Sequence, residues 1–412
     1  MTERLTDEQW MQQTLALARD GVALTSPNPC VGAIVVAANG EAVGRGTHTY
    51  EGKMHAEVLA IHEAGKRARG ATLYVNLEPC SHVGRTAPCA DAVIEAGIRR
   101  VFVGVRDPNP LVGGRGIARM QAAGIEVVEG IGEAEAKKLN EAFARYIRHK
   151  LPFVTLKTAM TLDGKIAPPP GESGSSGLGS LGSSGGWITS EVAREHVHQM
   201  RHANDAILVG VGTVIADDPL LTDRTGLARR RPLLRVILDS RLRLPLDSRV
   251  VKTAREDVTV FCCFAEENKR RELESRGVIV EQVPMQRPLG DNTIVFPAGA
   301  PSVDGRPDLN RVMAELGKRQ ITSLIIEGGA LVNWAALSEG IVDKIFFYYA
   351  PKILAGTGSI PFALGAGYRR ISEAASVHSL TLHRFGEDFA VEGYLRDPYR
   401  DEIRLVPPLE GS

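Results

Sequence analysis

A histidine and two cysteines in the first quarter of the chain have the composition of a catalytic zinc site. His55 is followed two positions later by Glu57, and Cys80 and Cys89 each directly follow a proline. A catalytic zinc ion takes three protein ligands and keeps a fourth position for a water, whose pKa it lowers to about 7. A carboxylate held off the metal can take the proton of that water and pass it to a departing amine. The residues therefore predict His55, Cys80 and Cys89 as zinc ligands and Glu57 as the catalytic acid and base.

Two other interpretations of these residues stay open at this point. The site could be a closed structural zinc site with His48 or His82 as the fourth ligand, which would explain the cysteines but not the placement of Glu57. The same residues could also be unrelated parts of a core. Cys30 is expected to be a small buried residue and not a further ligand.

Alternating strands and helices are predicted around these residues. Strands are expected over 33–37, 72–77, 100–105 and 125–128, and helices over 6–20, 89–96 and 117–123, with another helix opening at His55. Apolar spacing and the glycines Gly97 and Gly124 support these bounds. Cys89 would begin a helix, where the helix dipole favours a thiolate. The alternation predicts a mainly parallel α/β sheet.

A domain boundary is predicted at Leu151-Pro152, where one charged helix over 133–150 ends. This divides the chain into residues 1–150 and 151–412. In the second part, strands are expected over 153–159, 206–211, 233–239, 258–264, 323–326 and 344–350, and helices over 190–202, 266–275 and 309–318. Residues 171–186 include 13 glycines and serines, a composition that predicts a flexible loop inside this domain.

The second domain carries weaker chemical signals. The glycines of the run 327–330 follow a predicted strand and open a helix, a turn whose backbone N–H groups can hold a phosphate. The run 210–214 also follows a strand but lacks the third glycine of a dinucleotide fingerprint. Asp217 and Asp218 precede a proline and are expected in a solvated turn with exposed carboxylates.

The composition of the 412 residues limits the kinds of partner. Lys plus Arg and Asp plus Glu number 49 each, so the chain has no bulk attraction for nucleic acid. The first ten residues lack the layout of a signal peptide, and no apolar run is long enough to span a membrane. Five cysteines in so long a chain indicate no disulfide framework. We therefore expect a cytoplasmic protein with a small-molecule substrate and no membrane or nucleic-acid partner.

The zinc motif and several later motifs resemble one enzyme family. Eight residues separate Cys80 from Cys89, and the segment EPCSHVGRTAPC is similar to the riboflavin-pathway members of the cytidine-deaminase superfamily. The segments 26–29, 46–48 and 107–110 also match that pattern. Farther along, KTAMTLDGKIA, WITS, GVGTVIADDPLLT, VILDS, IIEGGALVNW and YYAPKILAGTG resemble the reductase domain of bifunctional riboflavin-biosynthesis deaminase–reductases. The resemblance spans roughly residues 8–397, in the order of the family.

This resemblance implies a fold, two activities and a set of binding residues. It implies a cytidine-deaminase-like α/β/α domain followed by a dihydrofolate-reductase-like α/β domain, in a homo-oligomer (a dimer or tetramer). The activities would be zinc-dependent deamination of a phosphoribosylaminopyrimidine and NADPH-dependent reduction of its ribosyl side chain to ribityl. The NADPH site would include Ala159, Trp187, Thr213, Asp217, Ser240, Gly329, Ala330, Leu331, Val332, Asn333, Trp334 and Ala335. The substrate sites would include Asn28, His48, Arg201, Leu221, Arg224 and Glu327.

Two of these substrate contacts have plain alternatives. Asn28 could aim at the amide edge of a pyrimidine from its two-proline turn, or it could be a turn residue only. Lys157 lies near the point where the family opens and reduces the sugar, and we infer a substrate contact for it. The alternative for Lys157 is a surface lysine at the end of a strand.

The Gly/Ser segment is the clearest departure from the family pattern. Gly185 stands where the family has a substrate-binding serine two residues before Trp187. Ser173, Ser183 or Ser184 could replace that serine, or the contact could be lost. One rival hypothesis is therefore a deaminase whose impaired reductase domain acts as a ligand-binding or scaffold domain. A second rival, which shares the His-x-Glu and cysteine chemistry, is a nucleic-acid base deaminase. The second rival fits poorly with the balanced charge and the longer cysteine loop.

Overall fold

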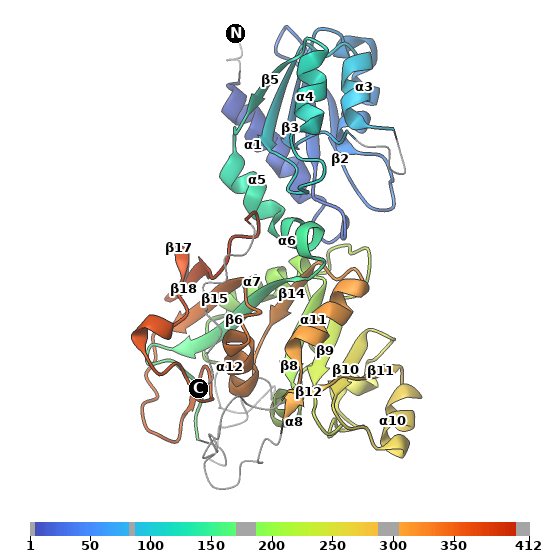
Figure 1. The fold of residues 1–412 in the computed structure, drawn as a ribbon. Coiled ribbons are helices and arrows are strands. Elements are labelled where there is room, and N and C mark those ends of the chain that lie inside the picture. Colours follow the sequence, from blue (N-terminus) through green and yellow to red (C-terminus); the bar gives the residue numbers. More distant parts are fainter. Residues whose placement is uncertain (1–4, 82–86, 170–186, 287–304, 401–412) are drawn as a thin grey trace. The chain divides into compact units, whose positions relative to one another are not determined.

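The computed structural model describes residues 5–81, 87–169, 187–286 and 305–400 (Figure 1). The chain folds as two compact units. Unit 1 comprises Met1–Lys150 with Ala228–Arg231, and unit 2 comprises Leu151–Leu227 with Pro232–Ser412. The Gly/Ser segment 171–186, with Gly185 and its three candidate replacement serines, lies outside the described residues. No described helix is long and apolar enough to cross a membrane.

Unit 1 is built on a five-stranded mixed sheet of order β2-β1-β3-β4-β5. β1 (Gly32–Val36) pairs antiparallel with both β2 (Ala42–Thr47) and β3 (Thr72–Leu77). β3, β4 (Arg100–Val105) and β5 (Glu126–Glu129) run parallel. The mainly parallel sheet is therefore confirmed for these three strands, whereas β2, at the antiparallel edge, was not predicted.

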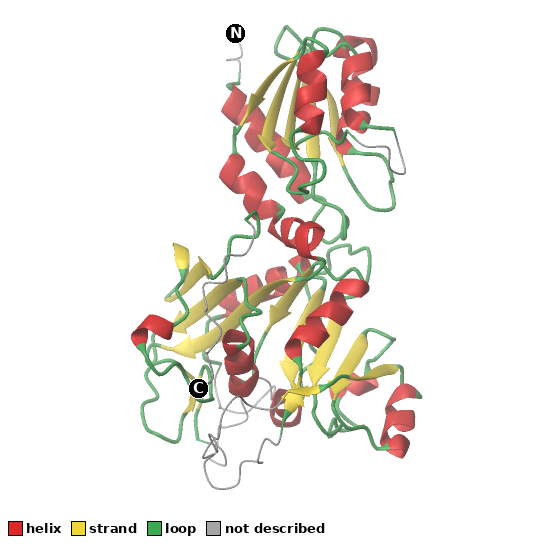
Figure 2. Ribbon diagram, viewed as in Figure 1, coloured by secondary structure: helices red, strands yellow, loops and turns green. Residues whose placement is uncertain are grey.

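Helices cover both faces of this sheet, which gives an α/β/α layered unit (Figure 2). On one face lie α1 (Asp7–Arg19) and α5 (Glu133–Leu139), and on the other lie α2 (Ala56–Ala64), α3 (Cys89–Glu95) and α4 (Arg115–Ala122). A 3-10 turn, η1 (Gly65–Ala68), follows α2. The Thr6 side chain caps α1 by accepting from the Gln9 backbone N–H, as expected of a threonine at this position.

The single helix predicted over 133–150 is wrong. The structure has two helices there, α5 and α6 (Glu141–His149), separated at Asn140. Asn140 has φ −111° and ψ 17°, outside the α-helical region. Its side chain bonds the backbone of Cys30 instead of pointing to solvent, and sequence periodicity cannot register such a tertiary contact.

Unit 2 is built on a nine-stranded sheet of order β11-β10-β9-β8-β14-β6-β15-β18-β17. The strands from β11 through β15 are parallel, and β18 and β17 add antiparallel pairs at one edge. Their bounds are β6 (Phe153–Thr161), β8 (Ala206–Gly210), β9 (Leu234–Leu238), β10 (Val258–Cys262), β11 (Val278–Gln282), β14 (Ser323–Ile326), β15 (Lys344–Ala350), β17 (His378–Phe385) and β18 (Asp388–Tyr394). Two short ladders join β7 (Lys165–Ala167) to β16 (Ile360–Pro361) and β12 (Met285–Gln286) to β13 (Arg306–Pro307).

Helices pack on both faces of the larger sheet. α11 (Leu309–Lys318) and α12 (Ala330–Ser338) share one apolar core with it. α8 (Val211–Asp217), α9 (Arg249–Lys252) and α10 (Glu267–Glu274) share a second core, and α7 (Glu191–Ala203) packs on β15 and β18. A short 3-10 turn, η2 (Ile371–Glu373), precedes β17. The predicted α/β class is confirmed, although α8 begins where the strand over 206–211 was expected to end.

Candidate functional site

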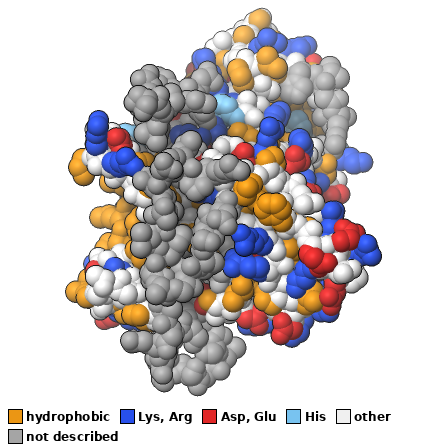
Figure 3. Space-filling model, turned by 60° about the horizontal axis from the view of Figure 1, so that its bottom comes forward, with side chains coloured by type: hydrophobic (Ala, Val, Ile, Leu, Met, Phe, Trp, Pro, Cys, Tyr) orange, Lys and Arg blue, Asp and Glu red, His pale blue; other side chains and the backbone are white. Residues whose placement is uncertain are grey.

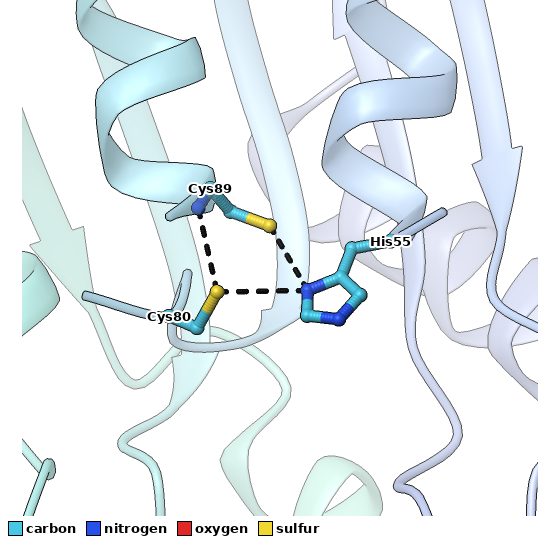
Figure 4. Close-up of side chains that lie close together, drawn as sticks. All are labelled: His55, Cys80 and Cys89. Carbon is cyan, nitrogen blue, oxygen red and sulfur yellow. Dashed lines mark hydrogen bonds between the residues drawn. The ribbon is translucent and has the colours of Figure 1, made fainter. Parts of the chain in front are cut away.

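The three predicted zinc ligands converge from separate elements of unit 1 (Figure 4). His55 immediately precedes α2, Cys80 follows β3, and Cys89 is the first residue of α3. His55 Nδ1 lies 3.1 Å from Cys89 Sγ and 3.5 Å from Cys80 Sγ. The side-chain ligand atoms of all three lie within 4.8 Å of one another. These residues, far apart in sequence, therefore form one compact donor set.

The donor set fits a catalytic zinc ion. Ligands of a tetrahedral zinc ion lie about 3.5 Å from one another, given metal–ligand bonds of about 2.0 to 2.3 Å. One imidazole and two sulfur donors match the composition of known catalytic sites. His48 does not complete a closed site, because its two ring nitrogens contact Asn28 and Met54. His82, the other candidate for a fourth ligand, lies outside the described residues.

Two close packing contacts hold α2, and with it His55, against the sheet. A Cβ added at Gly44 would lie 2.0 Å from the Ala60 carbonyl oxygen, and one at Gly46 would lie 2.1 Å from the Ala56 oxygen. Both distances are far below van der Waals contact, so β2 needs glycine at both positions. The unpredicted strand β2 therefore has a direct part in positioning His55, a predicted zinc ligand.

Glu57 is buried in the first turn of α2, next to the donor set. Its side chain is 3% exposed, and burial raises its pKa to about 7. The carboxyl group interacts with the Cys89 thiol and with the His55 ring. A carboxyl group with a pKa close to neutrality can both accept and release a proton, which suits an acid–base role.

The environment shifts the pKa values of the two cysteine thiols in opposite directions. A hydrogen bond from Cys89 lowers the pKa of the Cys80 thiol to about 4, and the same bond raises the pKa of Cys89. The Cys89 backbone N–H, at the start of α3, also donates to Cys80 Sγ at 3.3 Å. The local structure thus favours a thiolate at Cys80, and a thiolate is the form that binds metal.

Asn28 and His48 lie together beside this site. The His48 Nδ1 lies 2.9 Å from the Met54 carbonyl oxygen, which makes Nδ1 the protonated nitrogen. His48 Nε2 then accepts from Asn28 Nδ2 at 3.0 Å. The rings of His48 and His55 are in edge contact, with centroids 5.3 Å apart. Asn28 and His48, the predicted pyrimidine-binding residues, therefore lie beside His55, a predicted zinc ligand.

Glu78 is a structural residue of this site that the sequence analysis missed. Its carboxylate accepts four backbone N–H bonds, from Asp107, Gly114, Gly116 and Ile117, at 2.8 to 3.2 Å. It therefore ties the 107–114 loop and the start of α4 to the residues just before Cys80. A charged residue after five buried positions of β3 is the signal that could have revealed it.

In unit 2, three predicted substrate residues form a buried ionic cluster. Glu327 accepts two bonds from Arg201, at 2.6 and 2.9 Å, and lies 3.6 Å from Lys157 Nζ. Burial alone would raise the pKa of Glu327, but Arg201 and Lys157 outweigh it and lower the pKa to about 2. The alternative of a surface lysine is wrong, because Lys157 is 9% exposed.

The remaining predicted substrate residues of unit 2 lie on one loop. Arg224 is exposed, and its pKa is lowered by partial burial and by the charge of Arg201. The preceding residue, Asp223, bonds His202 of α7 at 2.8 Å and so fixes the loop. Leu221 is buried in the core, so only its backbone is available to a ligand. Arg201 and Arg224 therefore bring two guanidinium groups to this region, beside the carboxylates of Glu327 and Asp223.

The glycine turn predicted to hold phosphate joins residues from two helices. Gly328 and Gly329 have φ of +112° and +78°, conformations that only glycine adopts readily. Thr213 in α8 lies against Gly329, since a Cβ added there would be 3.3 Å from the Thr213 hydroxyl oxygen. The Gly210 N–H donates to the Gly328 carbonyl oxygen at 3.2 Å. Thr213 and the glycine turn, both predicted to bind the cofactor, are therefore adjacent.

Other predicted cofactor residues of unit 2 differ in exposure and in the residues that they contact. Trp187 is exposed, with the Arg194 guanidinium 4.7 Å from its ring centroid. Ala159 lies in β6 opposite Tyr348, and Ser240 donates to the Gly305 carbonyl oxygen. The expectation that Asp217 is an exposed carboxylate is wrong, because the residue is partly buried at the end of α8. This burial raises its pKa to about 7.

Asp218 also departs from the expected solvated turn. It is only partly exposed, and it accepts from the Arg249 backbone N–H at 2.6 Å. The turn is therefore folded against the start of α9. Two adjacent acidic residues before a proline gave no indication of this packing.

The run Gly329–Ala335 spans the turn and the first part of α12. Leu331 is exposed, and Ala330 and Val332 lie close to the turn. Trp334 packs edge-on against Tyr368. Asn333 and Ala335 are buried in the unit, and Asn333 Nδ2 donates to the Phe362 carbonyl oxygen at 2.6 Å. Only part of this run presents side chains to a ligand.

Two protein families match the chain, one in each unit. The zinc-binding region of cytidine and deoxycytidylate deaminases matches residues 4–105, and the RibD C-terminal domain matches residues 152–378. The first match includes all three predicted zinc ligands and Glu57. The second includes every predicted residue of the NADPH site.

Curated relatives and solved structures are similar over nearly the whole chain. The riboflavin biosynthesis protein RibD of Actinobacillus pleuropneumoniae is 40% identical over 394 residues, covering 96% of both chains. That of Escherichia coli K12 is 36% identical, covering 93% of this chain and 98% of the other. RibD of Acinetobacter baumannii superimposes with a TM-score of 0.76 at 35% identity, covering 94% of this chain and 98% of that one. A second solved structure superimposes with a TM-score of 0.73 at 36% identity and covers 94% of this chain and 98% of that one. It is the diaminohydroxyphosphoribosylaminopyrimidine deaminase/5-amino-6-(5-phosphoribosylamino)uracil reductase of Thermotoga maritima.

Proposed function

The chain belongs to the RibD family of bifunctional riboflavin-biosynthesis enzymes, and from this membership we propose which residues perform each of its two reactions. It is a zinc-dependent deaminase and an NADPH-dependent reductase. The deaminase removes an amino group from 2,5-diamino-6-(5-phosphoribosylamino)pyrimidin-4(3H)-one by hydrolysis. The reductase then converts the ribosyl side chain to ribityl. The convergence of His55, Cys80 and Cys89 beside buried Glu57 is the observation that carries the deaminase assignment at residue level.

Deamination would take place at the donor set of unit 1. His55, Cys80 and Cys89 would hold zinc, which when bound activates a water for attack on the amino-bearing carbon. Glu57 is the proton carrier: its carboxyl oxygen takes a proton as the water attacks and delivers it to the departing amine nitrogen. The Asn28 side chain, oriented by His48, would contact the amide edge of the pyrimidine. The burial of Glu57 excludes bulk water as a competing proton donor.

Reduction would take place near the ionic cluster of unit 2. Glu327 holds Arg201 through two bonds, so the guanidinium is fixed before any ligand arrives. The three cationic side chains Arg201, Lys157 and Arg224 outnumber the two nearby carboxylates, Glu327 and Asp223. This surplus suits a ribose phosphate, which guanidinium groups bind through paired hydrogen bonds. Lys157 would contact the sugar oxygens, while NADPH supplies the hydride.

The NADPH site would be formed around the turn at Gly328 and Gly329. The backbone at the start of α12 offers N–H groups to a phosphate, and Thr213 lies next to it. Trp187, Ala159, Ser240 and the partly buried Asp217 would line the rest of the site. Asn333 and Ala335 would act indirectly, by holding α12 in place.

The two rival hypotheses receive no support. Relatives with the same bifunctional name cover almost the entire chain, including both units, so an impaired scaffold domain is not favoured. The same similarity disfavours a nucleic-acid base deaminase. The face shown in Figure 3 carries both basic and acidic side chains among its described residues.

Self-association and location extend this proposal. β17 is an edge strand of the unit 2 sheet, and Leu380 and Leu382 on it are 62% and 75% exposed. Exposed leucines on an edge strand are costly for a monomer, so this edge would pair with a second copy of the chain. A biosynthetic enzyme with thiol ligands would function in the reducing cytoplasm.

A coupled assay tests the proposed function. Purified zinc-loaded protein would be given the diaminopyrimidine phosphoribosyl substrate with and without NADPH, while ammonia release and NADPH absorbance are followed. Ammonia release followed by NADPH oxidation is the expected result. Ammonia release without NADPH oxidation would support the impaired-reductase alternative, and no ammonia release would overturn the proposal.

A further inference from the structure

Two buried asparagine side chains bind the backbone just after the turn that carries Asn28. Asn140 Oδ1 accepts from the Cys30 N–H at 2.8 Å, and Asn140 Nδ2 donates to the Cys30 carbonyl oxygen at 3.0 Å. Asn76 Nδ2 donates to the same oxygen at 3.0 Å, and Asn76 Oδ1 accepts from the Gly32 N–H at 2.8 Å. Both polar groups of the Cys30 backbone are therefore held by side chains.

The hydrogen bonds of Asn76 lie directly beyond the end of the ladder between β1 and β3. The last paired residues of β1 and β3 in this direction are Ala33 and Val75. Asn76 is the next residue of β3, and its amide reaches across to Gly32 and Cys30. The ladder between β1 and β3 stops at Ala33, and beyond it the two asparagine amides bind the backbone of Gly32 and Cys30.

Asn140 comes from a distant part of the chain. It separates α5 from α6, and its side chain is 2% exposed. It also lies outside residues 4–105, the part that matches the deaminase zinc-binding region. The break between the two helices is thus explained by the bonds to Cys30, since a continuous helix would give Asn140 a different backbone conformation.

We propose that Asn140 is a positioning residue of the deaminase, which acts by fixing the pyrimidine-binding turn through the Cys30 backbone. This inference rests on the proposed contact between Asn28 and the substrate. Only Pro29 separates Cys30 from Asn28, and proline has little conformational freedom. The position of the Cys30 peptide therefore constrains the backbone of Asn28, whose side chain bonds His48.

The chemistry of the amide accounts for the choice of residue. One asparagine side chain offers a donor and an acceptor that match the N–H and carbonyl of a single residue. Aspartate would keep the acceptor but would set a carboxylate oxygen against the Cys30 carbonyl oxygen. Alanine would remove the bond to the Cys30 N–H and one of the two bonds to the Cys30 carbonyl oxygen, which Asn76 would still hold. In these bonds Asn140 contacts the Cys30 backbone and none of the predicted zinc ligands, so we expect its effect in substrate placement and not in zinc binding.

The test compares Asn140→Ala, Asn28→Ala and the double variant in the full chain. For Asn140→Ala we expect the KM of deamination to rise at least about tenfold, with kcat changed less. Zinc content and NADPH-dependent reduction of the deaminated intermediate should stay as in the parent. Because both residues act on one contact, their effects on kcat/KM should be less than additive in the double variant. Asn39→Ala, at an exposed loop asparagine, is the matched control.

The outcomes separate this inference from the proposed function. An unchanged KM in Asn140→Ala, or additive effects in the double variant, would overturn the inference while leaving the role of Asn28 intact. Loss of zinc or of reductase activity would also overturn it, because the role would then be general folding. An unchanged KM in Asn28→Ala would instead overturn the proposed substrate contact. If Asn140→Ala does not fold, Asn140→Asp, which retains the acceptor for the Cys30 N–H, should show the same KM effect.

Discussion

Glu57 combines the burial of a core residue with the chemistry of a catalytic one. A carboxyl group placed among thiol and imidazole groups, with almost no access to solvent, has its pKa raised towards neutrality. A residue with only a structural role would not need a carboxyl group in this environment, since an apolar side chain would be buried there at a lower cost in free energy. At the scale of single residues, the account therefore depends on what Glu57 does with protons.

Replacing this carboxyl group should abolish proton transfer without removing the metal. We expect Glu57→Gln to lower the kcat of deamination by about 10² to 10⁴, the usual contribution of a general acid or base. Zinc content should remain one per chain, since Glu57 is not among the three ligand residues. Metal analysis and an ammonia-release assay check this. A variant with near-parental kcat would show that another group carries the proton.

Asp217 predicts a pH dependence of stability. Burial raises its folded pKa to about 7, above the ordinary value of 3.8. A carboxyl group with a raised pKa contributes stability that is complete below pH 3.8 and is lost as pH rises through about 7. Relative to Asp217→Asn, the parent should thus lose about 1 to 2 kcal/mol of unfolding free energy between pH 4 and 8, allowing for partial exposure. Urea denaturation at several pH values measures this, and parallel curves for the two proteins would refute it.

At the scale of elements, the zinc site depends on how closely α2 approaches β2. The sequence motif indicated which residues are ligands and that a helix starts at His55, and the structure confirms both the helix and the convergence. The parallel strands and most helices also follow from apolar periodicity. The sequence did not predict β2, the break at Asn140 or the hydrogen bonds of Glu78. Each of these depends on a partner far away in the chain, which local patterns do not encode.

The close approach of α2 gives a prediction at this scale. Gly44→Ala would place a Cβ 2.0 Å from the Ala60 carbonyl oxygen, so α2 must move. We expect unit 1 to be destabilised by roughly 1 to 3 kcal/mol, with reduced zinc affinity and slower deamination. Reduction of the deaminated intermediate should be unaffected. Gly212→Ala is the matched control, because a Cβ there meets nothing within 4 Å. Equal behaviour of the two variants would contradict this packing argument.

At the scale of the whole molecule, two units with separate sheets carry two chemically different sites. The zinc donor set lies entirely within unit 1, and the ionic cluster and glycine turn lie within unit 2. The order of motifs in the sequence anticipated this division, because each family motif falls within one unit. Sequence patterns gave no measure of association between copies, which depends on the exposed edge of the unit 2 sheet.

The exposed leucines of β17 predict how association can be disrupted. Leu382→Lys places a charge on the edge strand and should shift the protein towards monomers, as measured by light scattering during size-exclusion chromatography. Ile371→Lys is the control, since Ile371 is 94% exposed but lies outside the sheet. If both variants keep the parental molar mass, the proposed interface is elsewhere or absent.

Removal of zinc tests most directly the claim that two independent sites share this chain. The protein would be treated with a chelator, and ammonia release from the diaminopyrimidine substrate and NADPH oxidation with the deaminated intermediate would be measured separately. The account predicts that ammonia release is lost and returns when zinc is added, while NADPH oxidation continues throughout. Ammonia release that persists in zinc-free protein would contradict the account at its centre.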